Sequence, residues 1–373
     1  MKLLCDENLW GGREMLAGLG ETRFRAGRDV TRADIAWADV LLLRSQTQID
    51  SDLLGNARPR FVATATAGTE HVNEALLARR GIPFASAPGS NAAPVADWVM
   101  SVLAIAMLER DFDPQGARCA VLGCGEVGSR VAHRLTALGA DVLAYDPPRQ
   151  AMGLPLPGRA VPLDEAIAAD LVTLHAPLTA KTRHLLGHSE IAALRPGAIL
   201  LNSARGSVID DAALRARLER RKDLFVALDV YEHEPVPDDG LLCRCRIATP
   251  HIAGHSIDGK YRGTAMVRDA LCRTLGLDVP DAGHELLPPA PATVVIGETL
   301  RDALVYAASA RSLERDARAW QAPAKDPAIR RARFDAMRRS YAAHRDFSEL
   351  RVVATGSAAR FLQGCGFRVE VPA

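Results

Sequence analysis

The chain has 373 residues, of which 48% are hydrophobic and 24% are charged. This composition is typical of globular proteins, and at about 100–200 residues per domain the length predicts two or three domains with sizeable cores. Lys and Arg (46) balance Asp and Glu (45), which leaves a formal net charge of +1. Because so small a charge creates no general attraction for polyanions, we expect no nucleic acid partner and no binding to anionic membranes.

The start of the chain and its cysteines indicate a reduced, cytoplasmic protein. The first residues turn acidic at Asp6 and lack the apolar core of a signal peptide. The longest apolar stretch, 98–108, is shorter than the ~20 residues needed to span a bilayer and predicts a buried helix. The seven cysteines are scattered, and Cys243 and Cys245 have no second pair at zinc spacing. We therefore expect no metal site.

Two blocks of alternating apolar runs and helical patterns predict two parallel sheets, each covered by helices on both faces. In the first block, strands are predicted at 2–5, 22–24, 40–43, 61–65 and 83–85, with a helix at 73–80. A loop at 88–91 precedes a long helix over 93–109. In the second block, strands are predicted at 119–122, 142–145, 171–174, 198–201, 225–228 and 247–248, with helices at 127–138, 163–168, 189–194, 211–220 and 257–275.

A shorter third block follows a segment at 276–291 that is rich in Gly, Pro and Asp and predicts a linker. Strands are expected at 294–296, 352–355 and 367–371, and helices at 298–320, 329–344 and 358–364. The block is a compact α+β unit of roughly eighty residues, a size that gains stability by packing on a partner. Its Arg-rich helix, 329–344, is expected to present a solvated, charged face.

The residues at 123–128 form a glycine fingerprint, G-x-G-x-x-G, which follows a predicted strand and opens a predicted helix. Gly123 permits the tight turn, Gly125 lets the backbone approach a pyrophosphate, and Gly128 lets the helix pack close to the strand. Asp146 ends the next strand, where a carboxylate accepts the ribose hydroxyls of NAD and repels the 2′-phosphate of NADP. The pattern predicts an NAD site; the alternative is a tight turn beside an ordinary loop Asp.

Three polar segments, 202–206, 228–235 and 249–254, each follow a predicted strand of the second sheet. Ligands bind outside the carboxyl ends of such strands, so Arg205, Glu234 and His251 are expected to share one site. Arg binds a carboxylate bidentately, and His takes a hydroxyl proton near neutral pH when a carboxylate orients it. Taken singly, each is more often a surface Arg, a solvated Glu or a structural His, but their joint placement favours catalysis.

On these residues the chain, from 1 to about 275, resembles the D-isomer-specific 2-hydroxyacid dehydrogenases. The motifs are the fingerprint, Asn-Ser-Ala-Arg-Gly, Asp-Val-Tyr-x-x-Glu-Pro and Thr-Pro-His-Ile-Ala-Gly. The loops at 43–45, 63–72 and 87–91, with the tail around 334–341 and 362–367, are similar to a branch of that family that oxidises 4-phospho-D-erythronate with NAD in pyridoxal 5′-phosphate synthesis. The resemblance also implies a homodimer formed through the tail.

The resemblance implies a role for each matching residue. His251 is the proton acceptor, Glu234 its partner, and Arg205 holds the substrate carboxylate. The implied cofactor-binding residues are Gly123, Gly125, Glu126, Val127, Gly128, Asp146, Ala176, Asp229 and Gly254, and the implied substrate-binding residues are Arg44, Ser45, Thr66, Gly68 and His255. One departure stands out, because His255 occupies the place of a family Tyr.

The substrate phosphate needs an anion site, and Arg44 and Ser45 follow a strand of the first sheet, where Thr66 and Gly68 add donors from the neighbouring strand end. Two alternatives stay open. Arg44 pairs with Asp6 or Glu7 instead, or the Arg-rich tail helix holds the phosphate.

The predicted fold class is α/β, with two doubly wound parallel-sheet domains and a small C-terminal α+β domain. A flavodoxin-like substrate domain is expected at 1–92 and 253–278, a Rossmann NAD domain at 93–252 and a dimerisation domain at 286–373. Two alternatives to the implied activity remain, a sibling dehydrogenase acting on another 2-hydroxy acid and a non-catalytic protein that senses NAD(H).

Overall fold

The computed structural model describes residues 1–110, 112–281, 283–341 and 344–372, which divide into two compact units. The first unit comprises Met1–Asn91 and Ser256–Pro289, and the second comprises Ala92–His255 and Ala290–Ala373. The chain thus changes unit within a few residues of the predicted positions 92 and 253. The tail, predicted as a domain of its own over 286–373, belongs by its contacts to the second unit from Ala290 onward.

The described part of the first unit is built on a five-stranded parallel sheet in the order β2-β1-β3-β4-β5. Its strands are β1 (Lys2–Asp6), β2 (Glu21–Arg25), β3 (Val40–Leu43), β4 (Phe61–Thr64) and β5 (Phe84–Ala85). Its helices are α1 (Gly12–Met15), α2 (Arg32–Trp37), α3 (Ser51–Leu54), α4 (Glu74–Arg79) and α12 (Ile257–Leu275). The strands are continuous apolar runs because both faces of the sheet are covered.

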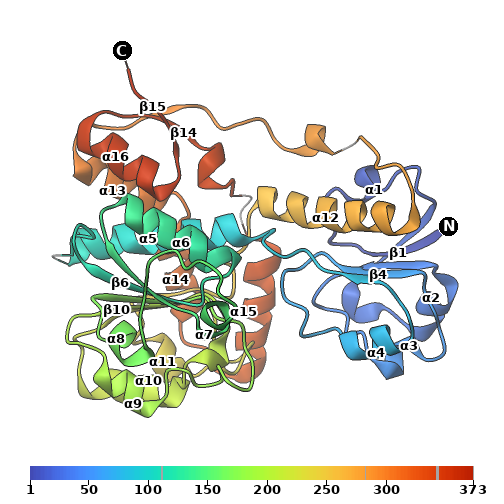
Figure 1. Cartoon of the computed structure of the whole chain (residues 1–373), viewed down its shortest axis with the longest axis horizontal. Helices are drawn as coiled ribbons and strands as arrows, with labels where there is room; N and C mark the ends of the chain where they lie inside the picture. The colour runs from blue at the N-terminus through green and yellow to red at the C-terminus, as the bar shows by residue number, and fades with distance from the viewer. Residues whose placement is uncertain (111, 282, 342–343, 373) are drawn as a thin grey trace. The chain divides into compact units, whose positions relative to one another are not determined.

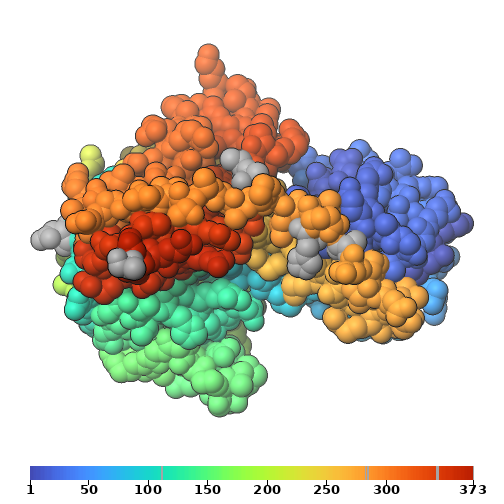
Figure 2. Space-filling view, turned by 90° about the horizontal axis from the view of Figure 1, so that it is seen from above, coloured from blue at the N-terminus to red at the C-terminus, as the bar shows by residue number. Residues whose placement is uncertain are grey.

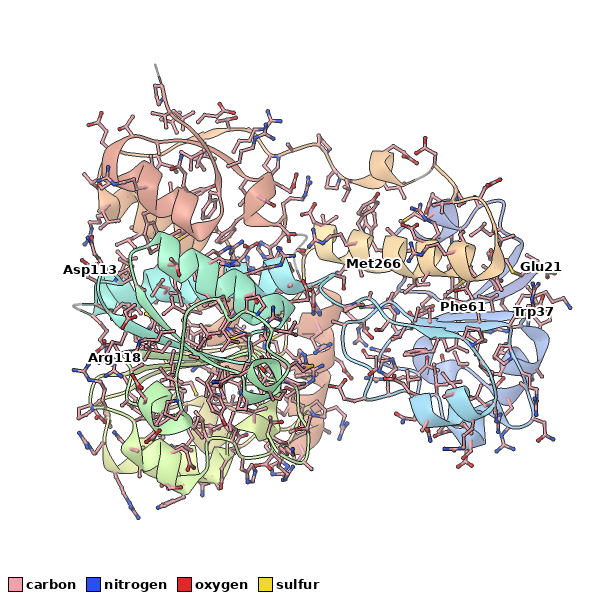
Figure 3. All side chains as sticks on the ribbon, in the orientation of Figure 1. Glu21, Trp37, Phe61, Asp113, Arg118 and Met266 are labelled. Atoms are coloured by element: carbon pink, nitrogen blue, oxygen red, sulfur yellow. The ribbon has the colours of Figure 1, made fainter. Side chains whose placement is uncertain are left out.

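Successive side chains of this sheet serve opposite faces, as strand geometry requires. Leu3 and Phe61 pack against Val267 of α12 on one face, whereas Leu4 and Leu41 pack with α2, α3 and α4 on the other. Figure 1 shows α1 and α12 on one side of the sheet and α2 to α4 on the opposite side. Phe61 and Met266, labelled in Figure 3, mark the strand layer and the helix layer.

The second unit contains, among the described residues, a seven-stranded parallel sheet in the order β12-β11-β10-β9-β6-β7-β8. The strands are β6 (Arg118–Leu122), β7 (Asp141–Tyr145), β8 (Arg159–Ala160), β9 (Leu171–Leu174), β10 (Ile199–Asn202), β11 (Phe225–Leu228) and β12 (Ile247–Ala248). The helices are α5 (Ala92–Glu109), α6 (Glu126–Ala137), α7 (Pro147–Ala151), α8 (Leu163–Ile167), α9 (His188–Ala193), α10 (Asp211–Arg220) and α11 (Asp239–Leu242). The predicted α/β fold class is confirmed.

Helix α5 is the most apolar helix of this unit, and by length and composition it could cross a membrane. However, 78% of its 18 residues are buried inside the structure. Trp98 and Leu103, for example, are fully buried in the core that α5 shares with α6 and the sheet. The apolar run at 98–108 therefore forms the buried core helix that the sequence predicts.

The tail adds a three-stranded parallel sheet, β13-β14-β15, in the residues that the structure describes. Its elements are β13 (Val294–Val295), α13 (Leu300–Ser309), α14 (Leu313–Gln321), α15 (Pro327–Arg339), β14 (Arg351–Val353), α16 (Gly356–Cys365) and β15 (Arg368–Glu370). Ala303 of α13 and Leu362 of α16 lie in the same core as α5. Figure 1 shows α13 and α16 against α5 and α6, and in Figure 2 the orange and red tail covers much of one face of this unit.

Two predicted tail helices differ in the structure. The helix expected over 298–320 is broken into α13 and α14, because Ser312 adopts a left-handed conformation with φ 54°. Arg311, beside this break, turns into the interior and is 1% exposed. The helix expected over 329–344 ends at Arg339, and residues 342–343 lie outside the described residues. Its face is also not uniformly solvated, since Arg330 is 1% exposed.

Candidate active site

Three adjacent strands bring the polar segments of the second sheet together. In the parallel register, Asn202 of β10 lies beside Leu228 of β11, and Leu228 lies beside Ala248 of β12. The loops after these strands are packed so closely that a Cβ on Gly206 would lie 1.8 Å from the carbonyl carbon of Tyr231. Glycine is therefore required at 206. The loop that carries Arg205 is thereby fixed against the loop that leads to Glu234.

His251 and Glu234 form a hydrogen-bonded pair. The His251 Nδ1 atom lies 2.8 Å from Glu234 Oε2, and Glu234 Oε1 accepts the backbone N–H of Tyr231 at 3.0 Å. A carboxylate accepts but does not donate, so Nδ1 carries the proton and Nε2 presents its lone pair. Burial raises the pKa of Glu234, but the His251 ring, the Tyr231 N–H and Arg338 together outweigh it, and the net pKa lies below its usual value. The pair is arranged for proton transfer at Nε2.

Asp229 organises the backbone of the His251 loop. Its Oδ1 accepts the Thr249 hydroxyl at 2.6 Å and the Ile252 N–H at 2.8 Å, and its Oδ2 accepts the Ala253 N–H at 2.9 Å. The Asp229 carbonyl also accepts the His251 N–H at 2.7 Å. Complete burial raises the pKa of Asp229, although His251 and these donors oppose the rise. The carboxylate predicted beside the cofactor therefore also bonds three donors of the neighbouring loop, which follows β12.

Arg205 lies half-buried at the end of a loop closed by Asn202. The Asn202 side chain donates to the Arg205 carbonyl at 3.1 Å and accepts the Ala204 N–H at 3.0 Å. The guanidinium Nη1 donates to the Ala204 carbonyl at 2.8 Å. The backbone that bears Arg205 is thus held by a local hydrogen-bonded turn after β10, and β10 pairs with β11, the strand that leads to Glu234.

The glycine fingerprint has the geometry that a dinucleotide requires. Gly123 has φ 92°, and a Cβ there would lie 2.5 Å from the backbone nitrogen of Ala176. A Cβ on Gly128 would lie 1.9 Å from the Gly123 carbonyl oxygen, so helix α6 packs tightly on the turn. At Gly125 a Cβ would meet no atom within 4 Å, which leaves open space at the start of α6. Glu126 and Val127 begin that helix, whose N-terminus favours an anion.

Asp146 follows β7 at the same edge of the sheet. Its Oδ2 accepts the Cys124 N–H at 2.8 Å, and its Oδ1 accepts the Arg149 N–H at 3.0 Å, which caps α7. A carboxylate offers about four lone-pair sites, so capacity remains for two ribose hydroxyls. The residues around the fingerprint therefore fit NAD. Gly254, in the loop after β12, follows Ala253, whose N–H is held by Asp229.

The predicted phosphate-binding residues lie in the first unit. Arg44 follows β3, and its Nη1 donates to the Asn8 carbonyl at 3.2 Å. The nearby Asp6 carboxylate interacts electrostatically with Arg44 and favours its charged form. The exposed Ser45 follows it. The Thr66 hydroxyl donates to the Gly68 carbonyl at 2.8 Å and lies 2.8 Å from the Thr64 hydroxyl. These contacts give the loop after β4 a defined shape.

Lys260 is a further candidate for binding the phosphate, although the sequence does not single it out. Three residues further along α12, a Cβ on Gly263 would lie 3.1 Å from the Ala65 carbonyl oxygen, so the helix passes close to the chain after β4. Residues three apart share a helix face, which places Lys260 on that side of α12. Burial and, second, the nearby Arg44 lower the pKa of Lys260. No sequence signal connects two cations that lie so far apart in the chain.

His255 lies in the second unit, beside the tail. Its ring meets Tyr341 edge to face, with centroids 5.9 Å apart. The predicted site residues therefore form two groups. Arg44, Ser45, Thr66 and Gly68 belong to the first unit, and the catalytic and cofactor-binding candidates belong with His255 to the second. The structure adds two tail residues, Arg311 and Arg338, that bond the backbone around His251.

Comparison with known proteins agrees with this geometry. Residues 104–253 match the model of the D-isomer specific 2-hydroxyacid dehydrogenase, NAD binding domain. Erythronate-4-phosphate dehydrogenase from Ectopseudomonas mendocina is 43% identical over 365 residues, which are 96% of each chain. The Azotobacter vinelandii protein of the same name is 42% identical over 380 residues, 97% of each chain.

A solved structure supports the fold. The TT0316 protein from Thermus thermophilus is similar with a TM-score of 0.63 and 27% identity, covering 76% of this chain and 99% of that one. The match accounts for nearly the whole of that protein but leaves about a quarter of this chain unmatched. The two relatives above, by contrast, match almost the full length.

Proposed function

The chain belongs to the erythronate-4-phosphate dehydrogenases, within the D-isomer specific 2-hydroxyacid dehydrogenase family, and we propose that it oxidises 4-phospho-D-erythronate to 2-oxo-3-hydroxy-4-phosphobutanoate. NAD is the cofactor, and the pathway is the synthesis of pyridoxal 5′-phosphate. The observation that carries the proposal is the His251–Glu234 pair, 2.8 Å apart, in the unit that also holds the dinucleotide fingerprint.

His251 serves as the base of the reaction. Its Nδ1–H is held by Glu234, so the Nε2 lone pair takes the proton of the substrate 2-hydroxyl. The ring becomes positively charged as it does so, and the adjacent carboxylate stabilises that charge. NAD supplies the acceptor for the hydride that leaves the same carbon. Glu234 therefore favours the proton-transfer step twice, by fixing the ring tautomer and by neutralising its charge.

Arg205 binds the substrate carboxylate. A guanidinium presents parallel donors that match the two oxygens of a carboxylate, and the charge also stabilises the oxygen of the developing ketone. The turn closed by Asn202 supports this role because it holds the Arg205 backbone in place.

Arg44 and Lys260 bind the 4-phosphate, with Ser45 and the loop from Thr66 to Gly68 as further contacts. In the described part of the chain neither cation is ion-paired with a carboxylate. Arg44 lies close enough to lower the pKa of Lys260, whereas Asp6 is the charge that acts on Arg44. The alternative in which Arg44 pairs with Asp6 or Glu7 is not favoured, because the Arg44 guanidinium donates to the Asn8 carbonyl instead. An anion would relieve the repulsion between the two cations.

Initial rates of NADH formation test the proposed function. The panel should contain 4-phospho-D-erythronate, D-erythronate, D-lactate and D-glycerate, each with NAD. We expect the phosphorylated four-carbon acid to have the highest kcat/KM. A higher kcat/KM on an unphosphorylated acid would identify a sibling dehydrogenase. Absence of turnover on all four, with NAD still bound, would identify an NAD-sensing protein.

The tail also forms a homodimer in this proposal, in the cytoplasm. Its surface carries exposed apolar side chains, with Val295 of β13 77% exposed and Val305 of α13 50% exposed. An apolar edge strand of this kind gains by pairing with a second copy. Sedimentation should therefore show a dimer at micromolar concentration, and Val295→Asp with Val305→Asp should shift it toward monomer. A monomeric parent chain would contradict the dimer.

A further inference from the structure

The tail contacts the catalytic loop through Arg311, which lies in the turn between α13 and α14. The Nη1 group donates to the Pro94 carbonyl in the first turn of α5 at 2.9 Å. The Nη2 group lies 3.3, 3.1 and 3.2 Å from the carbonyl oxygens of Ile252, Ala253 and His255. One buried guanidinium therefore donates hydrogen bonds to the carbonyl groups of three residues that follow His251. The break between the two helices aims this side chain at the loop.

A second tail arginine contacts the catalytic residue itself. Arg338, on α15, donates from Nη1 to the carbonyl oxygen of His251 at 3.1 Å. Its guanidinium stacks over Phe334 of the same helix, 5.0 Å from the ring centre, which restricts the side chain. His251 has φ 57°, a left-handed conformation that residues other than glycine rarely adopt. Such a backbone persists only when surrounding contacts hold it, and Arg338 is one of them.

The tail reaches the loop that precedes Glu234 at a third point. The indole N–H of Trp320, on α14, donates to the Tyr231 hydroxyl at 3.1 Å. That hydroxyl lies 2.9 Å from the Thr249 carbonyl, so it links the β11 and β12 loops. All three tail contacts lie within the second unit, and each bonds the backbone or side chain of a segment that carries His251 or Glu234.

We propose that the tail is a positioning element of the active site, in which Arg338 and Arg311 hold the His251 loop in its reactive conformation. This inference rests on the proposed function, because it assigns the base to His251. Both arginines are positioning residues, since they bond the loop backbone and neither is placed on substrate or cofactor. The tail is then part of the catalytic unit in addition to any role in assembly.

The first experiment compares three variants of the full-length protein. Arg338→Met removes the donor, Arg338→Lys retains a charged donor, and Arg339→Met is the control, because Arg339 is an exposed neighbour on the same helix. A misplacement of about 1 Å at a reacting group costs up to roughly 10²-fold, so we expect Arg338→Met to lower kcat about 10- to 100-fold. The KM for substrate, the affinity for NAD and the thermal midpoint should stay near wild type.

The conservative variant separates positioning from a general structural role. Arg338→Lys should recover a large part of kcat, and added guanidinium ion should partly rescue Arg338→Met. If Arg338→Met matches Arg339→Met in kcat, the proposal is overturned. It is also overturned if activity and thermal midpoint fall together with no recovery by lysine, because that pattern marks a residue needed only for folding.

A second readout needs no turnover. In ¹⁵N-histidine-labelled protein without substrate, the Nδ1–H resonance of His251, assigned with His251→Asn, should show the hydrogen bond to Glu234. We expect it to be weakened in Arg338→Met and in Arg311→Met, and retained in Arg339→Met. Unchanged resonances in a folded Arg338→Met protein would refute the positioning role. Failure of the wild-type protein to oxidise 4-phospho-D-erythronate would instead refute the proposed function and leave this comparison valid.

Discussion

The carboxyl edges of the two parallel sheets carry opposite electrostatic arrangements. In the second unit the reactive side chains are already paired, His251 with Glu234 at 2.8 Å, while Asp229 holds the neighbouring backbone. In the first unit Arg44 and Lys260 lie near each other as like charges, and within the described residues neither forms an ion pair with a carboxylate.

The difference follows from what each edge has to do. A base must be oriented before substrate arrives, so its partner belongs to the protein. A binding site for a dianion needs positively charged side chains whose charge the ligand neutralises. A protein carboxylate paired with those side chains would compete with the ligand. The same sheet geometry thus supports a preassembled proton-transfer pair in one unit and a pair of neighbouring cations in the other.

The largest expected effect comes from disrupting the His251–Glu234 pair. His251→Asn keeps a side-chain donor toward Glu234 but removes the Nε2 base, and loss of a positioned base typically costs ~10²–10⁴-fold. We expect kcat to fall in that range, measured as NADH formation, while calorimetry shows NAD binding near wild type. The exposed His188 on α9 gives a matched control, His188→Asn, with unchanged kcat. Substantial activity in His251→Asn would mean that another group is the base.

The second test removes the Arg44 guanidinium from the first unit and asks whether that group acts specifically on the substrate phosphate. Hydrogen bonds to a charged group are worth roughly 1.5–3 kcal/mol, so Arg44→Met should lower kcat/KM on 4-phospho-D-erythronate by roughly 10- to 150-fold. The loss on plain D-erythronate should be much smaller. Arg79→Met, an exposed arginine on α4, is the control. Equal losses on the two substrates would assign Arg44 to folding and place the phosphate elsewhere.

A smaller effect is expected for Asp146 of the second unit and the choice between NAD and NADP. Asp146 stands where the 2′-phosphate of NADP would lie, and Asp146→Ser keeps a helix-capping oxygen for the Arg149 N–H while removing the charge. One unit charge at close range near a protein surface is worth a few kcal/mol at most, so the ratio of kcat/KM for NADP to that for NAD should rise by about tenfold or more. An unchanged ratio, with both constants intact, would show that Asp146 does not select the cofactor.

Much of this arrangement could be predicted from sequence because it depends on local patterns. Buried strands such as β3 and β6 read as apolar runs, and the fingerprint at 123–128 is recognised from its spacing together with the strand before it and the helix after it. β8, at Arg159–Ala160, gave no such signal, because it is a two-residue edge strand with both residues exposed. The break at Arg311 was also invisible, since no glycine or proline marks it and the apolar pattern continues from α13 into α14.

Contacts between distant segments explain what the sequence could not show. Arg338 lies in a run of arginines that reads as a solvated face, yet it bonds a carbonyl 87 residues away in the chain. Arg311 bonds the Pro94 carbonyl 217 residues away. Arginine-to-carbonyl bonds leave no residue pattern, because every residue offers a carbonyl. The motif residues could therefore be found from sequence, whereas the residues that support them required the structure.

The smallest expected effect concerns pH and separates the two cations of the first unit. Burial and the nearby Arg44 lower the pKa of Lys260, so this lysine loses its proton at a pH below the ordinary lysine range. As pH rises into the alkaline range, Lys260 becomes neutral before Arg44 does, and the phosphate loses one of its two counter-charges. We therefore expect the KM for 4-phospho-D-erythronate to rise with pH by a few-fold, while the KM for D-erythronate stays flat.

Lys260→Arg should remove that rise, because a guanidinium stays protonated throughout the range in which lysine titrates. Lys222→Arg, at an exposed position in the second unit, is the matched control and should keep the wild-type profile. A phosphate bound through Arg44 alone would give the phosphorylated substrate the same flat profile as D-erythronate, before and after the Lys260 substitution. The pH dependence of KM thus decides whether Arg44 alone, or Arg44 together with Lys260, binds the substrate phosphate.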